Sequence, residues 1–136
     1  MSRLSFTIPG DPKGKGRPRV TKAGITYTPK ETVYYENLVR TCFWSQCPDA
    51  QPLQDAVRAD IDVYMSIPQS ASNRRKQLMS DGVIRPTKKP DLDNIVKIIL
   101  DSLNKIAYHD DSAVTDCMVR KWYSEQPRVE VTLEEI

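Results

Sequence analysis

PDLDNIVKIILDSLNKIA, residues 90–107, is the most strongly patterned segment of this chain. Its apolar residues recur at helical spacing, which predicts an amphipathic helix from about Asp91 to Ala107. Proline at position 90 disfavours helix in the residue before it, so the helix is expected to begin at Asp91 or directly after it. The residues expected to be buried on its apolar face are Ile95, Ile98, Ile99, Leu103 and Ile106.

Strands are predicted on both sides of this helix. Residues 57–67 alternate apolar and polar without a miss, and residues 3–8, 113–123 and 128–133 also have strand patterns. Helices are predicted from Pro29 to about Cys47, with Thr28 as the N-cap, and over residues 71–80. The order β, α, β, α, α, β, β indicates an α+β fold with a small mixed, partly antiparallel sheet packed with helices. At 136 residues the chain is expected to form a single domain, 1–136.

Composition places the chain among ordinary soluble globular proteins, with 28% charged and 39% hydrophobic residues. Its three cysteines are odd in number and lack CxxC spacing, which argues against a disulfide framework and a zinc site and favours a reducing, cytoplasmic location. We find neither a signal peptide nor an apolar run long enough to span a membrane, so no membrane partner is expected.

Positive charge is clustered, although the net charge is only +2. Residues 13–22 contain five basic side chains and no acidic one, and further clusters lie at 74–76 and 85–89. A solvated charged face explains any single cluster, but three of them favour a surface that meets phosphates. The first cluster is expected to be a flexible arm rather than a P-loop, because GxxxxGK[ST] is absent. The residues expected to contact DNA are Lys13, Lys15, Arg17, Arg19, Lys88 and Lys89.

Two aspartates, Asp91 and Asp93, stand at the start of the predicted helix, directly after two lysines. Hard cations such as Mg²⁺ bind through carboxylates, waters and substrate phosphates, and a helix N-terminus favours anions. This combination indicates a metal-dependent nuclease. The simpler alternative for Asp91 is a helix N-cap. Lys97, four residues after Asp93, is either a surface ion-pair partner or a group that contacts the scissile phosphate.

Asp110 and Asp111 follow the predicted helix at its far end. A straight helix of this length spans roughly 20 Å, which is beyond metal-ligand reach of Asp91 and Asp93 in the same chain. Either the chain doubles back, or the far acids act elsewhere, or a symmetric dimer brings Asp111 of one chain to Asp91 and Asp93 of the other. We favour composite sites across a dimer.

Several segments together resemble the RusA family of Holliday junction resolvases. They are KKPDLDN at 88–94, Lys97, DSLN at 101–104 and YHDDS at 108–112, while GKGRPRV at 14–20 and YTPK at 27–30 resemble its phage branch. The resemblance implies a homodimer that binds four-way DNA junctions and cuts two strands symmetrically with Mg²⁺, for which Mn²⁺ can substitute. By motif position it implies that the catalytic residues are Asp91, Asp93, Asp111 and Lys97, with Asp110 as a further metal ligand. The family often has arginines where this chain has Lys88 and Lys89.

The expected function is therefore a structure-specific endodeoxyribonuclease that resolves Holliday junctions in DNA recombination and repair. Two alternatives remain open: a metal-dependent nuclease for other branched DNA, such as forks and flaps, and a DNA-binding module without catalysis. His109, the only histidine, is expected to be a solvent-exposed loop residue rather than a ligand.

Overall fold

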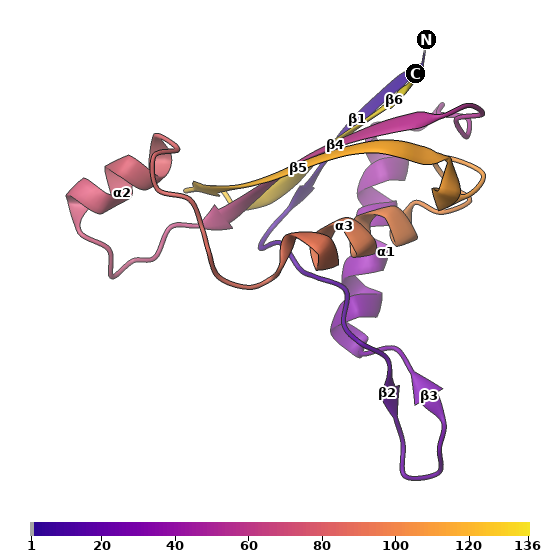
Figure 1. Ribbon diagram of the computed structural model, residues 1–136, viewed down its shortest axis with the longest axis horizontal. Coiled ribbons are helices and arrows are strands. Elements are labelled where there is room, and N and C mark those ends of the chain that lie inside the picture. Colours follow the sequence, from indigo (N-terminus) through magenta and orange to yellow (C-terminus); the bar gives the residue numbers. More distant parts are fainter. Residues whose placement is uncertain (1) are drawn as a thin grey trace.

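The computed structural model describes residues 2–136, and its centre is a four-stranded sheet with the order β1-β6-β4-β5 (Figure 1). Strand β6 runs antiparallel to both β1 and β4, whereas β4 and β5 are parallel. The predicted α+β fold with a mixed, partly antiparallel sheet is confirmed. The four strands are β1 (Arg3–Pro9), β4 (Val57–Ser66), β5 (Val114–Ser124) and β6 (Arg128–Glu135).

Two helices, α1 (Lys30–Gln46) and α3 (Leu92–Ser102), cover one face of this sheet, and the shorter α2 (Asn73–Ser80) lies beyond its end (Figure 1). Because parallel strands cannot be joined by a tight turn, the chain between β4 and β5 must cross over, and it forms α2 and α3 on the way. This crossover places the start of α3 beside the last residues of β4, where one cleft is lined by both segments.

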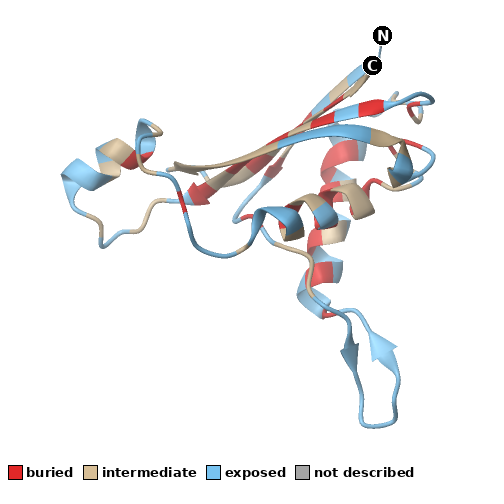
Figure 2. Cartoon of the chain, viewed as in Figure 1, coloured by how far each residue is buried: buried red, intermediate tan, exposed pale blue. Residues whose placement is uncertain are grey.

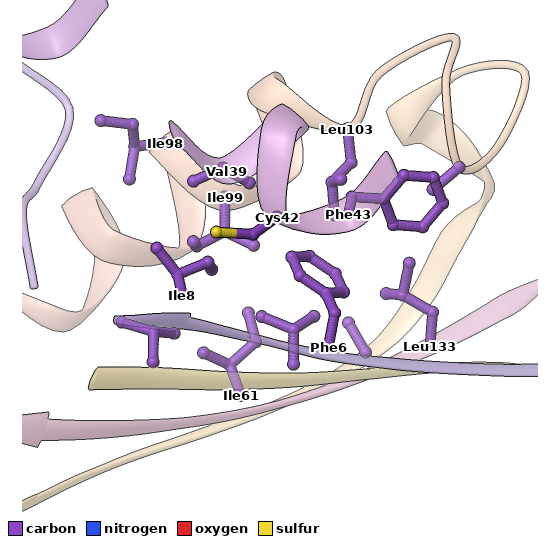
Figure 3. Close-up of a cluster of buried hydrophobic side chains, with 14 of the residues drawn as sticks. Phe6, Ile8, Val39, Cys42, Phe43, Ile61, Ile98, Ile99, Leu103 and Leu133 are labelled. Atoms are coloured by element: carbon purple, nitrogen blue, oxygen red, sulfur yellow. The ribbon is translucent and has the colours of Figure 1, made fainter. Parts of the chain in front are cut away.

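The core lies between the sheet and the two covering helices (Figures 2 and 3). The alternating pattern of β4 sends Val57, Ala59, Ile61, Val63 and Met65 inward, and all five are buried. From the helices, Ile95, Ile98, Ile99 and Leu103 are fully buried, as the pattern predicts. The rings of Phe6 on β1 and Phe43 on α1 meet edge to face, with centroids 5.4 Å apart.

Two helix boundaries differ from the sequence-based expectation. Helix α3 ends at Ser102 rather than near Ala107, because the chain turns tightly at Leu103 and Lys105 takes a positive φ of 65°. Ile106, beyond that end, is partly buried rather than part of the helix. Helix α1 begins at Lys30, with Pro29 as its N-cap and no side-chain cap bond, so Thr28 does not cap it.

The basic segment expected to be a flexible arm contains a short antiparallel hairpin instead. Strands β2 (Arg19–Val20) and β3 (Thr26–Tyr27) pair, and Thr21 closes the turn by donating its N–H to the Ile25 carbonyl at 2.8 Å. Figure 1 shows this hairpin projecting beyond the N-terminal end of α1, away from the sheet.

All three cysteines of the described chain are free, with Cys42 buried and Cys117 exposed. Within residues 2–136, no helix combines the length and the apolar character needed to cross a membrane.

Candidate active site

The turn that opens α3 presents Asp91 without the usual capping bond. Asp91 occupies the N-cap position with extended backbone angles, φ −70° and ψ 149°, yet its carboxylate accepts no hydrogen bond from the first helical turn. An aspartate that serves only as a cap normally accepts such a bond. Capping therefore does not account for an aspartate at this position. Asp91 is exposed, so a ligand can reach its carboxylate.

The neighbouring charged groups are also free of ion pairs within the described chain. Asp93, in the first turn of α3, and Lys97, one turn later, are both exposed, and no ion pair joins them. The surface ion pair that was one alternative for Lys97 is thus not formed in the described chain. Both side chains lie on the solvent side of α3, opposite the buried Ile95 and Ile99.

A cleft of about 590 Å³ adjoins Asp91 and is rich in lysine. Its walls come from three separate segments: the loop after β1, the end of β4 and the turn before α3. Lys13, Lys88 and Lys89 are exposed around it. The charged and polar residues that line the cleft are Asp11, Lys13, Lys15, Ser66, Lys88, Lys89, Asp91 and Asn94.

Lys15, predicted to contact DNA, is instead engaged within the protein. Its Nζ lies 2.9 Å from Glu36 Oε2 on α1 and 3.2 Å from Asp101 Oδ2 on α3. Burial opposes the charge, but hydrogen bonds and attraction to these two carboxylates outweigh it and raise the pKa of Lys15. Its backbone N–H also donates to the Asn94 carbonyl at 2.9 Å. Lys15 therefore fastens the basic loop to both helices.

The same loop needs glycine where it meets α3. A Cβ at position 14 would lie 3.0 Å from Cβ of Asn94 and 3.1 Å from Cβ of Pro90. These contacts are tighter than side chains normally accept, so the small residue allows the loop to lie directly on the DLDN turn. On the far side of Lys15, the Gly16 N–H donates to Thr32 Oγ1 at 3.0 Å.

A second set of contacts holds the turn from its other side. Lys121 on β5 donates from Nζ to the carbonyls of Lys88 and Pro90, the latter at 3.0 Å. The Lys121 carbonyl in turn accepts from Arg85 Nε at 2.6 Å. Sequence analysis did not single out Lys121, because its partners lie 31 and 33 residues away and no local pattern marks the contact.

Arg85 is held by a stack on the outer face of the sheet. Its guanidinium carbon lies 3.6 Å from the centroid of the Trp122 ring, and Trp122 Nε1 donates to Asp62 Oδ1 at 3.0 Å. Asp62 on β4 thus orients the tryptophan. This chain of contacts connects β4 to the turn before α3.

Asp110 and Asp111 lie at the opposite end of α3. Asp110 caps a short 3-10 turn, Asp111–Ala113, and accepts from the Ser112 N–H at 3.2 Å. Hydrogen bonds from the side chain and from the backbone of Ser112 lower the pKa of the Asp110 carboxyl. The Asp111 N–H donates to Asn104 Oδ1 at 3.0 Å. His109 Nε2 lies 2.9 Å from Gln54 Oε1 and is exposed, as expected.

The four acids are therefore not gathered in one chain. Nowhere in residues 2–136 do three His, Cys, Asp or Glu side chains lie close enough to hold a metal ion together. The alternative in which the chain doubles back to join Asp111 to Asp91 and Asp93 is wrong. Two exposed carboxylates still fit Mg²⁺ in part, because this ion commonly takes one or two carboxylates and fills its shell with waters and substrate phosphates.

Comparison with known proteins identifies the class. The family model for "Endodeoxyribonuclease RusA" matches residues 9–134, nearly the whole chain, and the chain belongs to this family. It is accordingly an endodeoxyribonuclease, a hydrolase that acts within DNA strands, as the sequence motifs predicted.

Among individual proteins, the chain is similar to "Uncharacterized protein YqaN" of Bacillus subtilis (strain 168). The two are 38% identical over 141 residues, which cover 100% of this chain and 99% of the relative. The aligned region thus includes the whole of this chain.

Proposed function

We propose that this protein resolves Holliday junctions by divalent-metal-dependent hydrolysis, as a homodimer that acts in DNA recombination and repair. The observation that carries the proposal is the pair of exposed carboxylates, Asp91 and Asp93, which form no ion pair in the described chain, although Asp91 lines a lysine-rich cleft. Membership in the RusA family supports endonuclease chemistry at that place.

Asp91 and Asp93 would hold Mg²⁺, or Mn²⁺ in its place. When bound, the ion would polarise a phosphoryl oxygen and favour ionisation of a water near neutral pH. The chain's own groups orient the DNA around it: Lys13, Lys88 and Lys89 are exposed where the phosphates would lie. Lys97, exposed one turn after Asp93, is placed to offset negative charge that develops on the scissile phosphate.

A dimer would complete each site. Because α3 has 11 residues, its two ends are roughly 16 Å apart, and an antiparallel arrangement of two such helices would bring Asp110 and Asp111 of one chain to Asp91 and Asp93 of the other. A partly exposed apolar stripe supports helix-to-helix contact there: Leu92 is 38% exposed, and Val96 and Leu100 follow at four-residue spacing. Two nicks on opposing strands also require two sites related by a two-fold axis.

The decisive experiment compares labelled four-way junction, fork, flap and linear duplex with Mg²⁺ and with EDTA. We expect paired symmetric nicks in the junction with Mg²⁺ alone. An Asp93→Asn variant should bind the junction without cutting it, whereas Asp81→Asn, a change at the end of α2, should cut normally. Faster cleavage of forks or flaps would favour the broader nuclease, and binding without a metal-dependent product would favour a DNA-binding module.

The shared site has its own test. Asp91→Asn and Asp111→Asn chains are each expected to be inactive alone. When they are mixed and allowed to exchange subunits, heterodimers regain one intact site and nick one strand of the junction. A mixture as inactive as its components would disprove sharing. The phage type and the cytoplasmic location stay predictions.

A further inference from the structure

We propose that the β2–β3 hairpin is a branch-reading arm, which places Ile25 and Tyr27 against unstacked bases at the centre of a DNA junction. This inference rests on the proposed function, because it assigns to one surface the choice of branched over linear DNA.

The hairpin exposes apolar side chains that nothing in the described chain covers. Val20 is 65% exposed, Ile25 63% and Tyr27 46%, and Figure 2 shows the whole hairpin in the colour of exposed residues. A two-stranded hairpin has little stability in water by itself, and such a combination of apolar side chains is normally covered by a partner.

The pairing of the two strands places Ile25 and Tyr27 on one face, whereas Val20, which lies opposite Thr26, is on the other face. Arg19 lies directly opposite Tyr27 in the register, and Thr21 is bonded to Ile25 through its N–H at 2.8 Å. Residues opposite each other, and those two apart along a strand, share a face of an antiparallel pair. One face of the hairpin thus carries a cation, an aromatic ring and a branched apolar side chain. Such a face can stack on bases while it neutralises phosphates.

Charge indicates nucleic acid as the partner. Between Pro12 and Lys30 the chain has no acidic residue, whereas six lysines and arginines fall in the same range. A polyanion complements this surface, whereas a mixed-charge protein surface has no such advantage. The basic residues in the range are Lys13, Arg17, Arg19, Lys22 and Lys30, together with Lys15, whose charge is paired with Glu36 and Asp101.

The hairpin is also continuous with the candidate active site. A second cavity, of about 300 Å³, is lined by Lys13 and Gly14, which also line the cleft at Asp91, and extends to Arg17 and Arg19 at the base of the hairpin. A DNA strand that lies in the cleft would therefore pass along the second cavity toward the hairpin. Lys15 fastens the loop between the cleft and the hairpin to both helices. The protein therefore sets the distance between the cleavage site and the bases that the hairpin would contact.

Branched DNA has accessible base faces on which this face of the hairpin can stack, and linear DNA lacks them. In a continuous duplex the base faces are covered by stacking, so an aromatic ring gains little without a costly kink. At a branch point stacking is interrupted, and base faces are accessible to a side chain. A contact of one base with one aromatic ring corresponds to about fivefold to 150-fold in affinity.

The test uses the full-length protein and an Ile25→Ala/Tyr27→Ala variant, with Val83→Ala as the control. Val83 is 68% exposed and lies outside the hairpin, in the turn that follows α2. Dissociation constants are measured in EDTA for a four-way junction and for a linear duplex of equal length. The junction carries 2-aminopurine next to its branch point, so that unstacking is read as fluorescence. Light scattering gives the mass of each protein.

We expect the double variant to bind the junction at least about fivefold more weakly, to bind duplex within about twofold of wild type, and to lose the fluorescence increase. Tyr27→Phe should retain most of the effect, and Val83→Ala should match wild type. Equal losses on junction and duplex, or an unchanged fluorescence response, would overturn the branch-reading role while junction cleavage stands. A change from dimer to monomer would also overturn it and assign the hairpin to subunit contact. Failure of the wild type to cut any DNA would instead refute the proposed function itself.

Discussion

Replacing Lys15 by methionine is expected to destabilise the fold, whereas the same replacement at Lys13 is expected to weaken DNA binding alone. The two lysines are separated by one glycine in the same basic loop, and a sequence pattern treats them alike. In the structure, Lys13 is exposed at the cleft, and Lys15 lies between Glu36 and Asp101. Comparison of the two variants therefore distinguishes the role of a lysine in DNA contact from its role in fastening the loop.

The magnitude follows from the exposure of the ionic groups. The side chain of Lys15 is 22% exposed, and those of Glu36 and Asp101 are 13% and 31% exposed. Breaking a fully buried pair costs about 3–5 kcal/mol, and exposed pairs contribute about 0–1 kcal/mol. For this intermediate burial we expect a loss of about 2 kcal/mol in the free energy of unfolding. For a domain of this size, that lowers Tm by about 6 °C.

Both variants are measured by urea and thermal unfolding, and by junction binding at several salt concentrations in EDTA. Lys13→Met should unfold within about 0.5 kcal/mol of wild type, because its side chain has no partner in the described chain. Removal of one phosphate contact should reduce the slope of log K against log salt by about one. Wild-type stability of Lys15→Met, or a reduced salt slope in this variant alone, would show that Lys15 does not fasten the loop.

Three further predictions concern groups around the site. Lys121→Met removes the donor to the Pro90 carbonyl, and we expect kcat on junctions to fall by about 100-fold with unchanged Kd. The control Arg3→Met, at the far end of β1, should have no effect. A proportional loss of binding by Lys121→Met would show that Lys121 contacts DNA instead. Burial opposes the charge of Lys15, but hydrogen bonds and attraction to Glu36 and Asp101 outweigh it and raise the Lys15 pKa above its ordinary 10.5. Its ion pairs are therefore fully present below that pH and are lost as pH rises through the folded-state pKa. The stability difference between wild type and Lys15→Met should accordingly vanish in strongly alkaline urea titrations, and a difference that vanishes on acidification to pH 6 would contradict this. Within residues 2–136 the buried hydroxyl of Tyr35 has no hydrogen-bond partner, so Tyr35→Phe should leave the free energy of unfolding unchanged or raise it by about 1 kcal/mol in urea melts. A clear decrease would reveal a partner.

The elements of this fold could be predicted where one short segment carries its own signal. The alternation of β4 and the helical spacing of α3 each show which face of the element is buried. This pattern can be read within one short stretch of sequence, without knowledge of the segments that pack against it. The DLDN turn and the Asp-Asp pair could be found for the same reason, since each is contiguous in sequence. The predicted end of α3 near Ala107 is wrong, because apolar residues continue at helical spacing after the helix has ended at Ser102.

Contacts between distant segments could not be predicted in this way. Lys15 meets Glu36 across 21 residues, and Lys121 meets the Pro90 carbonyl across 31, so both contacts exist only once the crossover has set the strand order. Local sequence patterns are therefore enough to indicate the helices and strands, the acidic motif and the family resemblance. Packing of separate segments decides which lysines face the cleft and which are ion-paired, and it leaves no three metal-binding side chains together within residues 2–136. The reason is physical: periodicity records the environment of a segment, whereas the partner of a side chain depends on how separate segments are packed together.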